Sequence, residues 1–159
     1  MPRDNEVSVV NVRLVKEPSL YSPEPIHSPQ DVLDVIAKEL SQYDREVFAI
    51  LNLKSNGQVI NLNIASVGTL DAAMVSPREI FKSSILSNAG AFIAIHNHPS
   101  GNLEPSQEDF ATTKRLKECG DLLGVRMLDH IIVGGGTGRM MSFNEEGYLN
   151  PSSRNDWER

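Results

Sequence analysis

The chain has 159 residues, of which 40% are hydrophobic and 23% charged, and this predicts a single globular domain with a core of its own. Its net charge of −6 argues against tight binding to duplex DNA, because such binding draws most of its affinity from Lys and Arg on phosphates. The single cysteine, Cys119, excludes an internal disulfide, and no segment resembles a signal peptide or a membrane span, so we expect a cytoplasmic protein.

The first predicted elements are a strand, a linker and a helix. Residues 1–27 are interpreted as an N-terminal strand over Val7–Lys16, where β-branched residues are frequent, followed by a Pro-rich linker. A helix is then expected from Ser28 to about Tyr43. Ser28 suits the N-cap, proline follows it, and Asp31 lies three residues beyond the cap.

A β-hairpin and a second helix are expected next. Strands are predicted over Arg45–Leu53 and Gln58–Val67, joined by Asn56-Gly57, a pair that favours a type I′ turn because both residues tolerate positive φ. A helix is predicted from Ser76 to about Asn88, opened by a capping box of Ser76 and Glu79.

The remaining chain alternates short strands with one helix. We expect strands over Ala91–His96, Val125–Val133 and Arg139–Phe143, a helix from Ser106 to about Gly120–Gly124, a turn over Gly134–Gly138, and a polar C-terminal tail over residues 148–159. The resulting order, βαββαβαββ, predicts an α/β fold with a mixed sheet flanked by helices.

Two histidines at the end of a predicted strand are candidate metal ligands. His96 and His98 are two residues apart, so their side chains point the same way. Asp109 lies in the first turn of the following helix, and the intervening loop can bring that turn back over the strand end. Three nitrogen and oxygen ligands with one open position are typical of catalytic zinc, although iron or manganese would accept the same ligands.

The same residues also have purely structural explanations. Histidines beside a loop are often surface residues, and Ser106 with Asp109 forms an S-x-x-D capping box that by itself accounts for both. Spacing alone leaves the metal and capping interpretations evenly matched. His130 fits a hydrogen-bonded strand histidine better than a fourth ligand, with a supporting role beside Asp129 as the alternative. Cys119 is expected to pack in the core.

A family resemblance favours the metal interpretation. His96-x-His98, seven residues, Ser106, two residues and Asp109 match the JAMM signature of the MPN+ metalloproteases in full. The string HNHPSGNLEPSQED, with VGTLDAAMVSPREIFKSSIL before it and LLGVRMLDHIIVGGG after it, closely resembles the bacterial RadC family, a branch of the same superfamily. The similarity covers about Tyr43 to Phe143. It implies an MPN/deaminase-like α-β-α sandwich with a mixed central sheet, and a RadC-like MPN (JAB) domain over residues 28–147.

The resemblance also implies a function and a role for each site residue. It implies a zinc metallopeptidase that hydrolyses a peptide or isopeptide amide bond, with one Zn²⁺ held by His96, His98 and Asp109. The family's general base, an upstream glutamate at a strand start, matches Glu46, which would move a proton from the attacking water to the leaving amine. Ser106 would stabilise the oxyanion. Glu79 is the competitor for the base, and Glu46 is preferred because Glu79 has a place in its capping box.

Two other functions stay open at this stage. One is a non-catalytic, metal-binding accessory module, and the other is a DNA-repair-associated factor, as the RadC name suggests. The residues before Glu46 do not resemble the helix-hairpin-helix segment of typical RadC proteins, which weakens the second. The expected partner is a peptide or protein substrate, with no strong nucleic-acid binding and no membrane. Homo-oligomerisation is left open.

Overall fold

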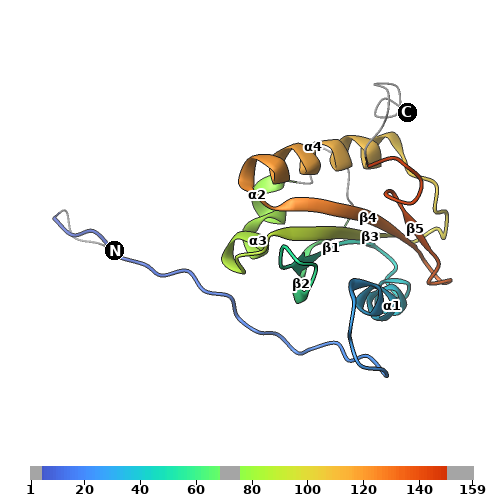
Figure 1. Ribbon diagram of the computed structural model, residues 1–159, viewed down its shortest axis with the longest axis horizontal. Coiled ribbons are helices and arrows are strands. Elements are labelled where there is room, and N and C mark those ends of the chain that lie inside the picture. The colour runs from blue at the N-terminus through green and yellow to red at the C-terminus, as the bar shows by residue number, and fades with distance from the viewer. Residues whose placement is uncertain (1–4, 69–75, 150–159) are drawn as a thin grey trace.

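One mixed β-sheet forms the centre of the computed structural model, which describes residues 5–68 and 76–149 (Figure 1). Its strands are β1 (Glu46–Leu53), β2 (Val59–Gly68), β3 (Ala91–His98), β4 (Arg126–Gly134) and β5 (Met140–Ser142). They lie in the order β2-β1-β3-β4-β5. The pair β3 and β4 is parallel and the other neighbours are antiparallel.

Helices cover both faces of this sheet. Helix α1 (Pro29–Leu40) lies on one face, while α2 (Pro77–Ile80), α3 (Lys82–Leu86) and α4 (Gln107–Leu123) pack on the other, and Figure 1 shows α1 and α4 on opposite sides. None of the helices in the described ranges is both long and apolar enough to cross a membrane. The expected α-β-α sandwich with a mixed sheet is confirmed.

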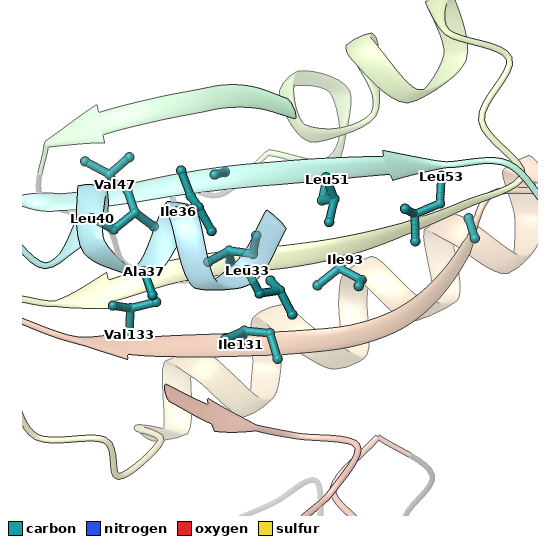
Figure 2. Packing of buried hydrophobic residues seen from close by; sticks show 13 residues of the cluster. Leu33, Ile36, Ala37, Leu40, Val47, Leu51, Leu53, Ile93, Ile131 and Val133 are labelled. Carbon is teal, nitrogen blue, oxygen red and sulfur yellow. The ribbon is translucent and has the colours of Figure 1, made fainter. Parts of the chain in front are cut away.

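Side-chain alternation along the strands divides the core between the two faces. Figure 2 shows the layer under α1, in which Leu33, Ile36, Ala37 and Leu40 face Val47, Leu51, Leu53, Ile93, Ile131 and Val133 of the sheet. Residues one position away, such as Phe48 and Phe92, point to the opposite face and pack beneath α4 with Leu116. Burying both faces explains why β1 and β3 are almost continuously apolar.

The strand expected over Val7–Lys16 does not form. No residue of this segment has strand structure, and Figure 1 shows the chain extending away from the sheet before α1. Its apolar side chains lie in solvent, with Val9 93% exposed. β-Branched residues favour an extended backbone, but a strand also needs a pairing partner and a face to bury. The order of elements is therefore αββααβαββ.

The hairpin between β1 and β2 uses a different turn from the predicted type I′. Only Gly57 has positive φ in this loop, at 90°, whereas Asn56 does not. The Gly57 N–H donates to the Lys54 carbonyl at 2.8 Å, and the Lys54 N–H donates to the Gln58 carbonyl at 2.8 Å. This is the longer loop in which a type I turn is followed by a left-handed glycine, so one residue with positive φ is enough.

The single helix expected over 76–88 is divided at Phe81. The Phe81 ring is buried and lies edge-on to Phe92, with ring centroids 5.2 Å apart. The predicted capping box is wrong as well, because Ser76 makes no side-chain capping hydrogen bond. Glu79 instead pairs with Lys82 at 3.1 Å on the exposed surface.

The start of the predicted polar tail is part of the core. Leu149 is 4% exposed, and the Tyr148 ring lies 5.1 Å from that of Phe110. An aromatic and an aliphatic side chain gain more from burial than from solvent, so the packed domain extends to Leu149. The rest of the predicted tail, residues 150–159, lies outside the described residues.

Candidate metal centre

Three side chains from two elements converge at the C-terminal end of β3. His96 Nε2 lies 3.1 Å from His98 Nε2 and 3.1 Å from Asp109 Oδ1, and His98 Nε2 lies 3.2 Å from Asp109 Oδ2. One nitrogen or oxygen atom of each residue falls within 4.8 Å of the others, so this group could hold a metal ion. The structure thus brings together the three residues that the sequence proposed as ligands.

Local hydrogen bonds at the start of α4 aim the Asp109 carboxylate. The Ser106 N–H donates to Asp109 Oδ2 at 2.8 Å, and the Asp109 N–H donates to Ser106 Oγ at 3.1 Å. This is the capping box expected from the sequence. It also holds Asp109 facing His96 and His98, so the capping and metal-site interpretations describe the same geometry.

The tautomer of His98 follows from its second ring nitrogen. His98 Nδ1 lies 2.7 Å from the carbonyl oxygen of Asn102. A carbonyl can only accept, so Nδ1 carries the proton. With the proton fixed on Nδ1, Nε2 is the nitrogen that His98 can offer to a metal ion beside Asp109 and His96.

The converging atoms make an electron-rich cluster with little exposure to water, since the His96 side chain is 5% exposed and those of His98 and Asp109 are 14% exposed. Burial would raise the pKa of Asp109, but the imidazoles of His96 and His98 beside its carboxylate hold that pKa well below its usual range. Burial would lower the pKa of His98, but Asp109, the Asn102 carbonyl and the charge of Glu46 together raise it. Such a cluster attracts cations.

The donor set and its spacing fit zinc. Ligand atoms about 2.0–2.2 Å from a tetrahedral zinc ion are separated by roughly 3.3–3.5 Å, close to the 3.1–3.2 Å observed between these atoms. Imidazole nitrogen and carboxylate oxygen are both ordinary zinc ligands.

His130 lies directly behind His96. Its ring is fully buried, with Nε2 2.8 Å from His96 Nδ1 and Nδ1 2.5 Å from Thr113 Oγ1. His130 is therefore a hydrogen-bonded strand histidine, as expected. Its ring contacts His96 and Thr113, whereas Asp129 accepts from the His130 backbone N–H at 2.7 Å. The Asp129 carboxylate is occupied by the Ser142 hydroxyl and by backbone N–H groups.

Thr113 was missed by the sequence analysis. It lies four residues after Asp109 on α4, on the same face of the helix, and that spacing was the available signal. Cys119, by contrast, packs partly buried against the core beneath α4, as expected.

Glu46 is the first residue of β1, and its half-buried carboxylate is near enough for its charge to raise the pKa of His98. Glu79, the competing candidate, is on the exposed surface in its pair with Lys82. This location is compatible with the base role that the family resemblance implies for Glu46.

Asn97, also missed by the sequence analysis, holds the backbone on both sides of Glu46. Its fully buried side chain accepts a hydrogen bond from the Val47 N–H at 2.6 Å and donates to the Arg45 carbonyl at 3.0 Å. The residue between the two histidines thus ties the strand that carries them to the start of β1.

The domain that contains this site can be assigned to a protein family. Residues 26–148 match the family model described as the RadC-like JAB domain, and the chain belongs to that family. The resemblance seen in the sequence is thereby confirmed.

Similar curated proteins carry the name UPF0758 protein. The one from Staphylococcus carnosus is 44% identical over 132 residues, which is 83% of this chain and 58% of the relative. Others from Staphylococcus aureus and Desulfitobacterium hafniense are 48% and 42% identical over 124 residues, 78% of this chain and 56% and 54% of the relatives. The chain spans little more than half the length of these relatives, and their names state no activity.

Proposed function

We propose that this chain is a zinc-dependent hydrolase of the metallopeptidase type that cleaves a peptide or isopeptide amide bond. The observation that carries the proposal is the convergence of His96, His98 and Asp109, with both imidazoles presenting Nε2 to the carboxylate. The RadC-like JAB domain match supports a metal-dependent hydrolase in general, and the donor set favours zinc.

The three ligands would hold the ion and leave a coordination position for a reactant. A zinc ion in such a site polarises a carbonyl oxygen and lowers the pKa of a water that it binds. The capping box keeps the Asp109 carboxylate aimed at the histidines, and the Asn102 carbonyl keeps the His98 proton on the nitrogen that faces away.

Glu46 and Ser106 are the proposed catalytic residues. Glu46 would accept a proton from the attacking water and deliver it to the nitrogen of the leaving amine, as a general base and then an acid. Ser106 accepts the Asp109 N–H through its hydroxyl oxygen, and this bond does not use the hydroxyl proton. That proton would be donated to the oxygen that becomes negative when the amide carbonyl is attacked.

The test compares Glu46→Gln with a matched Glu79→Gln control. The zinc-loaded proteins are assayed on internally quenched peptide libraries and on peptides joined by a lysine isopeptide bond, and zinc content is measured in parallel. Glu46→Gln keeps the shape of the side chain and removes the basic oxygen, so turnover should fall about a hundredfold or more with zinc retained. Glu79→Gln changes the same group on the exposed surface and should behave as wild type.

Two results would count against these assignments. Loss of zinc in Glu46→Gln would make Glu46 a ligand, and retained turnover would place the base elsewhere. A wild-type protein that binds zinc tightly and cleaves neither substrate class would instead be a metal-binding accessory module.

A further inference from the structure

A continuous chain of hydrogen bonds links two of the proposed ligands through the interior. It starts at the backbone carbonyl of Asp109, which accepts from Thr113 Oγ1 at 2.8 Å. It continues from Thr113 Oγ1 to His130 Nδ1 and from His130 Nε2 to Nδ1 of His96. Thr113 and His130 are fully buried, so this chain runs through the core behind the ligands.

The direction of each hydrogen bond follows from the first one. A hydroxyl has one proton, and Thr113 donates it to the Asp109 carbonyl, which can only accept. Thr113 must therefore accept from His130, so His130 carries its proton on Nδ1. The His130 ring is buried and its hydrogen-bond partners are a hydroxyl and an imidazole, and a buried charge without a carboxylate partner is costly. His130 is thus neutral, with a lone pair on Nε2.

The same argument shows which ring nitrogen of His96 carries the proton. Because His130 Nε2 offers a lone pair, His96 must donate to it from Nδ1 across the 2.8 Å contact. The proton of His96 is then on the nitrogen facing the core, and Nε2 is the nitrogen that His96 can offer to a metal ion placed between it, His98 and Asp109.

Aromatic packing holds the middle of this chain in place. The His130 ring stacks on Phe143, with centroids 4.6 Å apart and planes 18° apart. Phe48 lies 5.9 Å away, tilted to His130, and itself stacks on His96 at 5.7 Å. The rings of His96 and His130 are therefore fixed in orientation as well as in hydrogen bonding.

We propose that Thr113 and His130 are positioning residues that fix His96 in the Nδ1-protonated tautomer and so prepare its Nε2 as a metal ligand. This inference rests on the metal site of the proposed function. One turn of α4 would then serve the site twice, because Asp109 is a proposed ligand and Thr113 determines which ring nitrogen of His96 carries the proton. Residues that orient metal ligands in this way typically change metal affinity by 10- to 100-fold when they are replaced.

The test compares Thr113→Val with Thr112→Val and Thr113→Ser. Valine keeps the shape of threonine and removes the hydroxyl, while serine keeps the hydroxyl. Thr112 is the neighbouring threonine, 5% exposed, and takes no part in the chain of hydrogen bonds. Zinc dissociation constants are measured by chelator competition. We expect Thr113→Val to bind zinc 10- to 100-fold more weakly, with Thr112→Val and Thr113→Ser close to wild type.

A second readout needs no metal. Long-range ¹H–¹⁵N correlation spectra of the metal-free protein report which ring nitrogen of each histidine carries the proton. Wild type should show the proton of His96 on Nδ1, and Thr113→Val should move it at least partly to Nε2, because His130 no longer has an acceptor for its own Nδ1 proton.

The outcomes separate this inference from the proposed function. Equal zinc affinity in the two valine variants, or a wild-type His96 protonated on Nε2, overturns the positioning role. A wild-type protein that binds no zinc refutes the proposed function, and the tautomer spectra then still decide whether Thr113 and His130 set the state of His96.

Discussion

Replacing Asn97 by Asp tests how the start of β1 is held. The amide of Asn97 accepts from the Val47 N–H and donates to the carbonyls of Arg45 at 3.0 Å and Leu40 at 3.4 Å. Asn97→Asp keeps the acceptor and loses both donated hydrogen bonds, and it sets a carboxylate oxygen against the carbonyls of Arg45 and Leu40.

The expected cost can be worked from these contacts. An acceptor shielded from water that loses its donor costs about 1–3 kcal/mol. The Arg45 carbonyl loses its donor at 3.0 Å, while the Leu40 carbonyl still accepts from the Tyr43 N–H and adds less. A total of about 2–4 kcal/mol is a large part of an ordinary stability of roughly 5–15 kcal/mol. For a domain of this size it corresponds to a fall in melting temperature of roughly 5–15 °C.

The loss of stability in Asn97→Asp should increase as the pH rises. Burial against carbonyls raises the folded-state pKa of the introduced carboxyl above its unfolded value. The destabilisation of Asn97→Asp is therefore smallest below the unfolded pKa, where a protonated carboxyl can donate to the Arg45 carbonyl. It grows as the pH rises and the group must ionise.

The assay is denaturant unfolding of the metal-free proteins at pH values from 4 to 8, with Asn56→Asp as the matched control. Asn56 is exposed in the hairpin, and its side chain only accepts from the Gln58 N–H, which a carboxylate does equally well. Asn97→Asp should bind zinc as wild type does, since its side chain points away from the histidine face. Equal stability of the two variants would refute the reasoning, and loss of zinc would show that Asn97 holds the ligands rather than the strand start.

Four further outcomes are expected. Metal analysis of the wild type should find about one zinc per chain, and replacing both His96 and His98 by Ala should abolish it. Ser106→Ala should retain zinc, lose about 1 kcal/mol from the helix cap and turn over more slowly, whereas wild-type turnover would leave the serine only its capping role. Gly120→Ala should lower the melting temperature, because a Cβ there would lie 2.4 Å from the Val125 carbonyl oxygen. Fluorescence anisotropy should show weak, salt-sensitive, sequence-independent binding to duplex DNA, and tight binding at physiological salt would contradict the expectation from the net charge of −6.

Elements with strong local signals were predicted closely from the sequence. The cap at Ser28 and the box of Ser106 with Asp109 mark the starts of α1 and α4, and Gly124, in the left-handed conformation, ends α4. The apolar runs of β1, β3 and β4 are long enough to identify them as buried strands. The convergence of His96, His98 and Asp109 was also anticipated, because spacing along one strand and one helix turn allows it and the family resemblance favoured it.

The errors occur where tertiary contacts, and not local sequence, determine the secondary structure. The segment Val7–Lys16 has the composition of a strand but pairs with no neighbour, and the helix break at Phe81 accompanies burial of its ring against Phe92. The roles of Thr113 and His130 depend on the parallel register of β3 and β4 and on the packing of α4 above them. The sequence pattern of a single strand or helix does not reveal how it aligns with its neighbours, so these contacts could not be predicted.

The alternation of His96, Asn97 and His98 along β3 has a consequence for folding. A slip of β3 by one residue against β1 would turn both imidazoles into the aliphatic layer under α1 and place Ile95 among the charged groups near Asp109. Polar rings buried without partners are costly, and every apolar side chain of the strand would change face at the same time. The two histidines thus penalise misaligned sheets, so residues proposed to hold a metal ion also help to select the native alignment of β3.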